Sequence, residues 1–312
     1  MKIIFIGTPK FASIILTRLI ENKYKPVLAI TALDKPVGRK QILTPSEVKL
    51  TCQKYKIPII QPKKIKDSTS EIKKLNPDLI VLTAYGQIVP KDILDIAKYG
   101  AINIHPSLLP KYRGASPIQN TILNGDKKTG ITIYLMDEKM DHGSILFNIE
   151  YLVPDKIYCE ELLNNLAELG AKLLMDALPK IENKDIKPKK QDEKKATYTK
   201  IINKEDGHIG WKKPAEEIER HIRAFHIWPG SFTFWEKNDK MLRIKILKAE
   251  VKKLSDNDYP FGKAVASPEN ELLIICRDNA LSVLELQLEG KKPMSSTEFL
   301  KGYPDIIGAI LK

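Results

Sequence analysis

Two short, continuous apolar runs constrain the fold of this chain more than any other feature. Residues 78–84 read DLIVLTA, and residues 2–7 read KIIFIG and stop at a glycine. A strand with one face in water alternates apolar with polar side chains, whereas a strand covered by helices on both faces does not. Neither run approaches the ~18–20 residues that cross a bilayer. Both runs therefore predict buried strands of a parallel sheet.

Helical patterns alternate with further strand patterns in the first half of the chain. We expect helices at residues 9–22, 45–56 and 160–178, strands at 26–32, 57–60 and 101–105, and a strand pair at 129–136 and 144–153. Residues 34–43 are polar and basic and are expected to form a loop. This alternation predicts an α/β domain with a doubly wound, mostly parallel, Rossmann-like sheet.

The composition changes near residue 190. Residues 187–195 read KPKKQDEKK, and large apolar side chains are almost absent until Tyr198. Beyond this stretch a helix is expected at 214–225 and short strands at 231–235, 242–251, 262–267, 271–276 and 280–288. Short strands at this spacing are typical of a small, OB-like β-barrel. We therefore expect a first domain at 1–189, a basic linker at 190–206 and a barrel domain at 207–312.

The charge of the chain is strongly positive. It carries 51 Lys and Arg against 39 Asp and Glu, a formal charge of +12. Residues 1–189 hold 29 basic and 20 acidic side chains, giving +9, and residues 190–312 hold 22 and 19, giving +3. This excess favours a polyanionic partner, because phosphate contacts release counterions, although a general enrichment in lysine is the alternative.

The cysteines are few and widely separated. Cys52, Cys159 and Cys276 are odd in number and form no CxxC pair. Neither a disulfide framework nor a thiolate zinc site is therefore expected, and the reducing cytosol is the expected compartment.

The first strand-to-helix turn lacks the glycines of a dinucleotide site. Residues 7–12 read GTPKFA, so only the first glycine of G-x-G-x-x-G is present, and Pro9 follows shortly after it. The backbone that cradles a pyrophosphate is not encoded, which argues against binding of a nicotinamide dinucleotide.

Polar side chains follow the strand expected at 101–105. Asn103 and His105 lie two residues apart and therefore point to the same face, at the carboxyl end of the strand, where open α/β sheets bind ligands. An amide donor beside an imidazole suits the stabilisation of an oxyanion together with proton transfer. The alternative is structural: Asn103 caps the strand end and His105 is a histidine with satisfied hydrogen bonds.

An acidic loop supplies a third candidate. Residues 136–143 read MDEKMDHG, and Gly143 is expected to adopt a left-handed conformation that presents Asp141 to His105. An aspartate in that place would support the protonated imidazole and define its tautomer. An ordinary turn between two strands is the alternative.

These motifs resemble those of the 10-formyltetrahydrofolate-dependent formyltransferases. The block NIHPSLLP at 103–110 and DHG at 141–143 carry the resemblance. With the branch of the family that formylates initiator methionyl-tRNA, the resemblance extends over essentially the whole chain. It includes FIGTP at 5–9, DKPVGR at 34–39, AYGQIVP at 84–90, HPSLLPKYRGASPI at 105–118, IRAF at 222–225 and WPG at 228–230.

The resemblance implies roles for particular residues. Asn103, His105 and Asp141 would be catalytic, and Arg39, with Lys40 beside it, would approach the acceptor stem of the tRNA. The residues that would line the folate pocket are Ser107, Leu108, Leu109, Pro110, Gly86, Gln87, Ile88, Val89 and Asp137. One departure from the family is Ser144, which stands where an acidic residue is frequent.

The reaction so implied transfers formyl from 10-formyltetrahydrofolate to the α-amino group of methionine on initiator methionyl-tRNA. The amine would attack the formyl carbon, Asn103 and protonated His105 would stabilise the oxyanion, and Asp141 would support the imidazolium. Acyl transfer between bound substrates requires neither a metal nor a nicotinamide. The resemblance further implies a monomeric, cytoplasmic enzyme that is not bound to a membrane.

Other functions share part of this pattern. Glycinamide ribonucleotide formyltransferase has the three residues but normally lacks a second domain of the size of 207–312. Formyltetrahydrofolate hydrolase would carry a regulatory domain ahead of the catalytic fold, which is expected to begin at Met1, and nucleotide-sugar formyltransferases remain a third enzyme alternative. A non-catalytic RNA-binding protein that retains an inactive transferase fold belongs to a different class, and the complete set of three residues argues against it.

The remaining histidines and tryptophans are expected to be structural. His221 and His226 are five residues apart, so they cannot share a helix face as metal ligands would. Trp211, Trp228 and Trp235 are expected in the core of the second domain, rather than on a surface that stacks bases.

Overall fold

The chain forms two compact units in the computed structural model, which describes residues 1–38, 40–254 and 259–312. The first unit comprises residues 1–117, 127–153 and 162–201. The second comprises residues 202–312 together with 118–126 and 154–161, two segments that lie before residue 190 in the sequence. In the described part of the chain, no helix is long and apolar enough to span a membrane.

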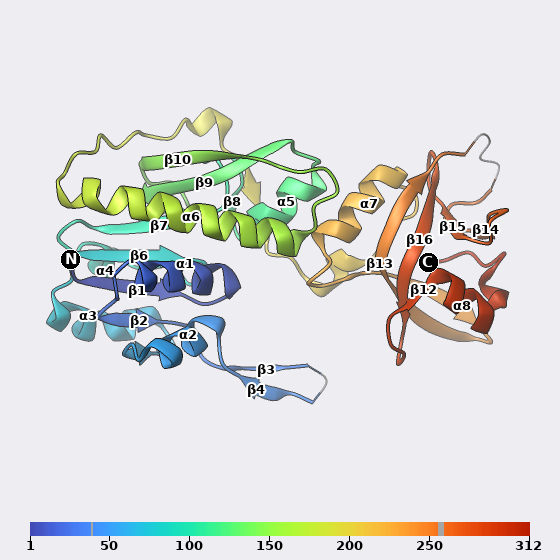
Figure 1. Ribbon diagram of the computed structural model, residues 1–312, viewed down its shortest axis with the longest axis horizontal. Coiled ribbons are helices and arrows are strands. Elements are labelled where there is room, and N and C mark those ends of the chain that lie inside the picture. The colour runs from blue at the N-terminus through green and yellow to red at the C-terminus, as the bar shows by residue number, and fades with distance from the viewer. Residues whose placement is uncertain (39, 255–258) are drawn as a thin grey trace. The chain divides into compact units, whose positions relative to one another are not determined.

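The first unit is built on a seven-stranded sheet with the strand order β10-β9-β7-β6-β1-β2-β5 (Figure 1). The strands are β1 (Ile3–Gly7), β2 (Leu28–Ile30), β5 (Ile59–Ile60), β6 (Leu79–Thr83), β7 (Ala101–His105), β9 (Lys128–Leu135) and β10 (Ile145–Leu152). Neighbours from β7 to β5 are parallel, whereas β9 runs antiparallel to both β7 and β10. The predicted parallel α/β sheet and its terminal antiparallel pair are confirmed.

Helices cover both faces of this sheet. On one face Gly170 of α6 lies against Ile104 of β7, Ile131 of β9 and Ile15 of α1. On the other face Ile72 and Ile93 pack with side chains of β1 and β6, namely Ile4, Ile6, Ile80 and Leu82. The helices of the first half are α1 (Lys10–Glu21), α2 (Glu47–Tyr55), η1 (Ile65–Ser68), α3 (Thr69–Leu75), α4 (Lys91–Leu94), α5 (Pro117–Leu123) and α6 (Cys159–Glu182).

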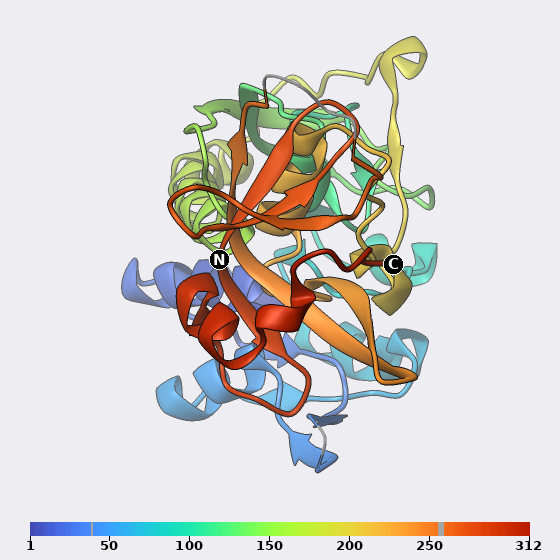
Figure 2. The same cartoon turned by 90° about the vertical axis from the view of Figure 1, so that its right-hand side faces the viewer.

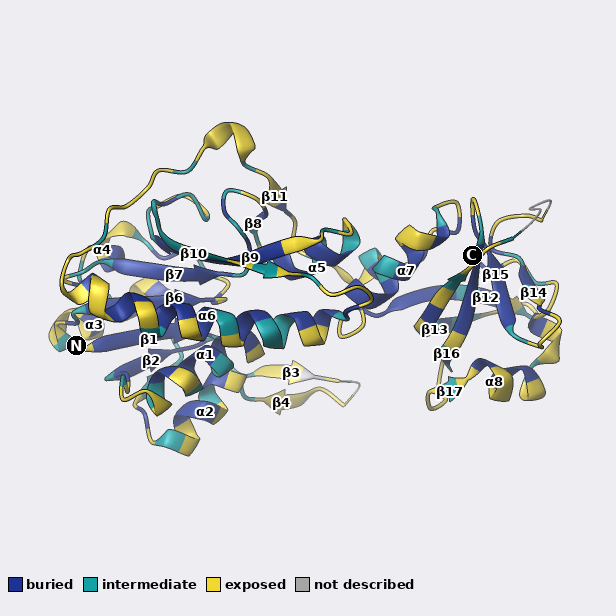
Figure 3. Cartoon of the chain, turned by 45° about the horizontal axis from the view of Figure 1, so that its top comes forward, coloured by how far each residue is buried: buried dark blue, intermediate teal, exposed yellow. Residues whose placement is uncertain are grey.

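A hairpin occupies the segment expected to be a loop at 34–43. Its strands are β3 (Lys35–Val37) and β4 (Ile42–Thr44). Ile42 and Leu43 are exposed, and β4 is exposed along its length in Figure 3. The loop prediction was wrong because each strand has only three residues and β4 is exposed throughout, so no periodic pattern marks the hairpin.

The second unit is an antiparallel sheet with the order β12-β13-β16-β15-β14, and β17 pairs with β16. Its elements are η3 (Lys204–Gly207), α7 (Ala215–Ala224), β12 (Ser231–Lys237), β13 (Lys240–Lys252), β14 (Ala264–Ala266), β15 (Leu272–Ile275), β16 (Ala280–Leu288), β17 (Met294–Ser295), α8 (Ser296–Gly302) and η4 (Pro304–Ile306). Figure 2 shows how strongly these strands curve.

The C-terminal segment closes this curved sheet. Lys312 exchanges two 2.9 Å backbone hydrogen bonds with Phe234 of the edge strand β12. Ile310 forms a bridge with Lys263, and the Ala264 N–H donates to the carbonyl of Ala309 at 2.8 Å, so the same segment also pairs at the other edge, beside β14. A sheet whose two edges are joined in this way is a small barrel, as predicted.

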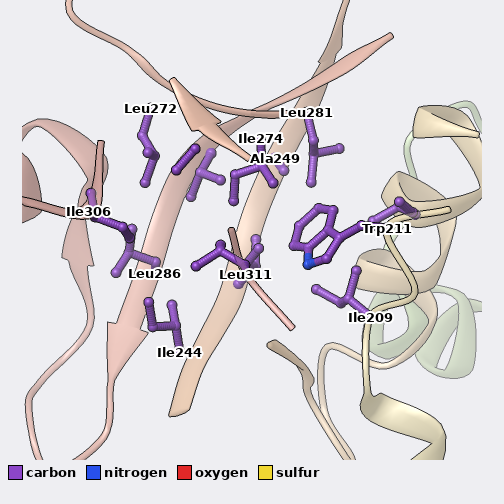
Figure 4. Packing of buried hydrophobic residues seen from close by; sticks show 14 of the residues in the cluster. Ile209, Trp211, Ile244, Ala249, Leu272, Ile274, Leu281, Leu286, Ile306 and Leu311 are labelled. Carbon is purple, nitrogen blue, oxygen red and sulfur yellow. The ribbon is translucent and has the colours of Figure 1, made fainter. Parts of the chain in front are cut away.

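The interior of the barrel is apolar (Figure 4). Trp211 and Trp235 are buried in it, as expected, and the Trp211 indole N–H donates to Thr233 Oγ1 at 3.0 Å. The expectation for Trp228 was wrong, because 52% of this residue is exposed. Trp228 lies in the turn between α7 and β12.

Candidate active site

The carboxyl end of β7 carries two buried polar side chains. Asn103 and His105 are only 7% and 5% exposed. Ile104 between them faces α6, so Asn103 and His105 point to the opposite face of the sheet. On the neighbouring strand β9, Asn103 pairs with Tyr134, and His105 pairs with Thr132. Strand alternation thus places the amide and the imidazole side by side, as the sequence predicted.

Asp141 reaches this pair from the loop between β9 and β10. Its Oδ1 accepts the hydroxyl proton of Tyr134 at 2.7 Å, and its Oδ2 accepts the backbone N–H of Gly114 at 2.6 Å. Both oxygens of the carboxyl group are therefore held by donors from different parts of the first unit. The sequence prediction that Asp141 lies near His105 is confirmed by a separation of 3.7 Å between Oδ2 and Nδ1.

The turn that presents Asp141 differs from the one expected. The left-handed residue is Asp141 itself, with φ of 49°, and not Gly143. A Cβ atom at Gly143 would collide with the backbone carbonyl oxygen of Leu135. Glycine is needed at 143 because the backbone at Leu135 approaches closely there, a contact across the loop that a turn pattern alone does not reveal.

His105 makes one hydrogen bond through its ring. Its Nε2 lies 2.9 Å from the backbone carbonyl oxygen of Tyr112. Because a carbonyl only accepts, Nε2 must carry a proton, and Nδ1 is the nitrogen that faces Asp141. At 3.7 Å from Oδ2, Nδ1 lies beyond hydrogen-bond distance and is the ring atom available for proton exchange.

Tyr134 joins two of the predicted residues and was not itself predicted. Its buried hydroxyl accepts from Asn103 Nδ2 at 2.8 Å while donating to Asp141. Burial, together with the charge of Asp141, raises the pKa of Tyr134 well above its ordinary value, so the phenol keeps its proton. Among the described residues, Asn103 Oδ1 is buried without a hydrogen-bond partner.

The segment after β7 is held by its own hydrogen bonds. Thr132 Oγ1 donates to the carbonyl of Ser107 at 2.7 Å and accepts from the N–H of Leu109 at 3.0 Å. Ser107 Oγ donates to the carbonyl of Lys111 at 2.6 Å. The side chain of Leu109 is buried, whereas Leu108 and Pro110 are partly exposed. Of the two leucines, Leu108 therefore has the larger part of its surface available to a ligand.

A second segment, residues 86–89, follows β6. The Gln87 side chain accepts from the N–H of Ile65 at 2.9 Å and donates to the carbonyl of Lys63 at 3.3 Å. Val89 is buried, and Ile88 is 82% exposed, an unusual state for a branched apolar side chain. Gly86 has φ of 86°, a left-handed conformation that favours glycine.

Asp137 lies at the start of the loop that ends at Asp141. Its Oδ2 lies 2.6 Å from Nδ1 of His142, and its Oδ1 accepts the N–H of Lys139 at 3.0 Å. The second ring nitrogen of His142 is 3.5 Å from Glu193 Oε1. Asp137 therefore supports the loop from within, and the structure shows no contact of Asp137 with the pair on β7.

Part of the segment expected to be a linker packs against this loop. Gln191 Nε2 donates to the carbonyls of Asp141 and Gly143 at 2.9 and 2.8 Å. Its Oε1 accepts from the buried guanidinium of Arg113, which also forms two hydrogen bonds, of 3.0 and 2.7 Å, with Glu193. Short strands β8 (Arg113–Gly114) and β11 (Tyr198–Thr199) pair in parallel beside η2 (Glu193–Lys195). The sequence offered no local signal for these contacts.

Of the two residues predicted to contact tRNA, Lys40 lies in the turn between β3 and β4. Arg39 is outside the described residues. Lys40 is exposed in the turn. Apolar Ile42 and Leu43 lie next to it on β4, also exposed.

The described residues show neither a cluster of metal ligands nor an exposed thiol. Among the described residues, no group of three or more His, Cys, Asp or Glu side chains is arranged to hold a metal ion. The three cysteines are buried, and burial raises the pKa of the thiols to about 11 for Cys52 and about 12 for Cys159 and Cys276. These thiols stay protonated at neutral pH and are poor nucleophiles.

Comparison with known proteins places this geometry in a family. Residues 1–178 match the formyl transferase family, and residues 201–304 match the formyl transferase C-terminal domain. The chain is 42% identical to methionyl-tRNA formyltransferase of Caldanaerobacter subterraneus subsp. tengcongensis over the whole of both chains. It is 44% identical, again over the whole of both chains, to the methionyl-tRNA formyltransferase of Caldicellulosiruptor saccharolyticus.

Solved structures show the same fold at lower identity. An N-formyltransferase of Helicobacter canadensis, in complex with folinic acid and dTDP-3-aminofucose, has a TM-score of 0.64 and 22% identity, covering 91% of this chain and 98% of that one. A variant of HypX from Aquifex aeolicus has a TM-score of 0.66 and 16% identity over 98% of this chain and 50% of that one. From these matches, and above all from the residues 1–178 that match it, the chain belongs to the formyl transferase family.

Proposed function

We propose that this protein transfers a formyl group from 10-formyltetrahydrofolate to the α-amino group of methionine on initiator methionyl-tRNA, producing formylmethionyl-tRNA for translation initiation. The observation that carries the proposal is the identity of 42–44% to methionyl-tRNA formyltransferases over the full length of both chains. Similarity to sugar-directed enzymes is limited to a shared fold at 22% identity. The acceptor proposed is therefore the tRNA-linked amine.

In this proposal Asn103 stabilises the negative charge that develops on the formyl oxygen. One N–H of its amide is bound by Tyr134, which leaves the second N–H free to donate. The unpaired Oδ1 marks the amide as a group with unused hydrogen-bonding capacity in a buried place. Such a group fits a polar ligand, because a buried atom without a partner is unfavourable until it gains one.

His105 and Asp141 act on the proton. When the folate donor is bound it supplies the formyl carbon, which forms a bond to the amine nitrogen and breaks its bond to N10, while one proton passes from the amine to N10. His105 Nδ1 is placed to carry that proton, since Nε2 is already committed to the Tyr112 carbonyl. Asp141, 3.7 Å away, compensates the positive charge of the ring when it is protonated.

The folate is proposed to bind beside these residues, against Ser107, Leu108, Leu109 and Pro110, the segment Gly86, Gln87, Ile88 and Val89, and the loop from Asp137 to Asp141. Support comes from the exposed apolar side chain of Ile88, which suits a flat ring. Both segments follow strands of the parallel sheet at its carboxyl edge, where such sheets bind ligands.

The tRNA is proposed to contact Arg39 and Lys40 and to be anchored by the barrel domain, taken as residues 207–312. The +9 excess of residues 1–189 (29 basic minus 20 acidic) supports a polyanionic partner. We further propose that the protein acts in the cytoplasm as a monomer. The catalytic domain is then 1–189, with 190–206 leading to the barrel.

One assay tests this function directly. Purified protein is given 10-formyltetrahydrofolate and initiator tRNA charged with methionine, and formylmethionyl-tRNA is measured after mild deacylation. Parallel reactions offer glycinamide ribonucleotide, an amino sugar nucleotide, or water alone. Formylation of the charged tRNA, with turnover of the other acceptors at least ~100-fold slower in kcat/KM, is the expected result. Preferential formylation of any other acceptor would overturn the proposal.

A further inference from the structure

Tyr134 occupies a position that links Asn103 to Asp141, and the direction of its hydrogen bonds is determined by chemistry. An ionised carboxylate accepts hydrogen bonds and cannot donate them, and a tyrosine has a single O–H. Because Asp141 Oδ1 lies 2.7 Å from the Tyr134 oxygen, that proton goes to the carboxylate. The phenol oxygen is then left only with acceptor capacity.

The group of Asn103 that faces Tyr134 must consequently be the amide NH₂, at 2.8 Å. A reversed amide would place two acceptors, the Asn103 carbonyl and the Asp141 carboxylate, against one phenolic proton. The amide oxygen is thereby turned away from Tyr134, to the side where it has no partner among the described residues. Asp141 thus determines the orientation of Asn103 through Tyr134.

We infer that Tyr134 is a positioning residue for formyl transfer, which orients the Asn103 amide and holds one oxygen of Asp141. This inference rests on the proposed function, in which Asn103 and Asp141 act on the substrates. Tyr134 touches both residues, and both hydrogen bonds of its buried hydroxyl are made to them. Register pairing of Asn103 with Tyr134 across β7 and β9 keeps the two side chains adjacent.

The decisive variant is Tyr134→Phe, which keeps the ring and removes the hydroxyl. Without it the Asn103 amide is free to rotate by half a turn, and Asp141 Oδ1 loses a donor. We expect kcat for formylation of charged initiator tRNA to fall about ten- to one-hundred-fold, with KM for both substrates nearly unchanged. A kcat within about twofold of the wild-type value would overturn the inference.

Tyr151→Phe is the matched control. Tyr151 lies on the adjacent strand β10, and its hydroxyl accepts from Asn165 at 2.9 Å, away from Asn103 and Asp141. This variant loses the same atom and the same kind of hydrogen bond. Thermal unfolding of both variants, followed by circular dichroism, establishes that each is folded at the assay temperature. Equal kcat losses in the two variants would show that Tyr134 has no special role.

Two further measurements separate positioning from mere packing. Combined with Asn103→Ala, the Tyr134→Phe change should lower kcat much less than it does alone, whereas equal losses of kcat in both backgrounds would contradict the inference.

The side-chain amide protons of Asn103, assigned in NMR spectra by their loss in Asn103→Ala, should shift in Tyr134→Phe and not in Tyr151→Phe. Unshifted protons would also overturn it. If the wild-type protein fails to formylate charged tRNA, the proposed function is wrong. The chemical shifts of the Asn103 amide protons still show in that case whether Tyr134 orients the amide.

Discussion

Each unit of this protein contains a buried cluster of polar side chains, and the two clusters differ in the hydrogen-bonding capacity they leave unused. In the second unit Glu219 and Arg223, one turn apart on α7, form two 2.9 Å hydrogen bonds with each other. Arg223 also donates to the carbonyl of Ile157 at 2.9 Å, and Lys156 lies 3.2 Å from Glu219. None of the buried nitrogen or oxygen atoms of this pair lacks a partner.

The cluster in the first unit is incomplete by comparison. Asn103 keeps an unpaired oxygen, and Nδ1 of His105 has a carboxylate nearby without a hydrogen bond to it. A buried polar group whose bonds are all made within the protein contributes to the fold, whereas one with capacity to spare is available to a ligand. The difference sets the Glu219–Arg223 pair, which is structural, apart from the residues proposed to carry out the reaction.

Two histidines show the same contrast within a single residue type. His221 on α7 has both ring nitrogens bound, Nδ1 with Ser231 Oγ at 2.8 Å and Nε2 with the carbonyl of Asp206 at 2.8 Å. Burial lowers its pKa from 6.5 to about 4, so the ring stays neutral at physiological pH. His105 has one nitrogen bound and the other open. His221 is therefore structural, as the sequence predicted.

The largest expected effect is on stability, in the second unit. Arg223→Met leaves the buried Glu219 with Lys156 as its remaining cationic neighbour, and the loss should be about 3–5 kcal/mol in the free energy of unfolding, measured with urea. The double variant Arg223→Met with Glu219→Leu, which removes both charges, should recover most of the lost stability. Arg18→Met, which breaks an exposed pair with Glu168, is the control and should cost below about 1 kcal/mol. Similar losses in the two single variants would contradict the comparison.

The next effect is on turnover, in the first unit. Asn103→Ala should lower kcat by about 10²–10³-fold, the usual cost of one oxyanion donor, because the amide acts on the developing charge. The free energy of unfolding should change little, since the amide leaves one atom unpaired in the native state. Asn165→Ala, on α6, is the control and should leave kcat unchanged. Normal turnover of Asn103→Ala would show that Asn103 only caps the end of the strand.

His221 provides a smaller effect that depends on pH. Above pH 6.5 its ring is neutral in both states; between 6.5 and about 4 the unfolded chain binds a proton that the folded chain does not. The free energy of unfolding therefore decreases as the pH is lowered from 6.5, and the loss reaches about 3 kcal/mol below pH 4.

Denaturant unfolding of wild type and His221→Gln across this pH range measures that loss as a difference between the two curves. The variant should show the flatter curve. His226→Gln, which replaces an exposed histidine beyond the same helix, should behave as wild type. Parallel curves for wild type and His221→Gln would show that the buried ring does not stay neutral.

The parts of this molecule that were predictable from sequence are those specified by local periodicity. Continuous apolar runs located β1 and β6, and alternation placed Asn103 and His105 on one face of β7. Tyr134 escaped because its role depends on the register between β7 and β9, which places it opposite Asn103. Within its own strand Tyr134 is an ordinary β-forming residue.

Contacts between residues that are not neighbours in the sequence explain the other failures. Gly143 is required by the approach of the Leu135 backbone, and Gln191 holds the Asp141 loop from a lysine-rich stretch that reads as a linker. Composition identifies such a stretch as polar, and it does not reveal that a buried arginine, Arg113, anchors its glutamine. Sequence reasoning predicted the residues that lie together at the end of β7 and missed Tyr134 and Gln191, which hold them.

The smallest expected effect concerns neither buried cluster and involves Arg39 and Lys40, the two residues proposed to contact tRNA. Arg39→Ala should raise KM for tRNA several-fold, leave KM for folate and kcat unchanged, and reduce the slope of log kcat/KM against log salt by about one. The reason is that a phosphate contact releases counterions, whereas this residue takes no part in the proposed transfer of the formyl group. Lys40→Ala, beside it, should act in the same direction. Lys128→Ala is the charge-matched control, because its ammonium already lies 3.2 Å from Glu150. An unchanged salt slope for Arg39→Ala, with the control behaving as wild type, would place the tRNA contact elsewhere.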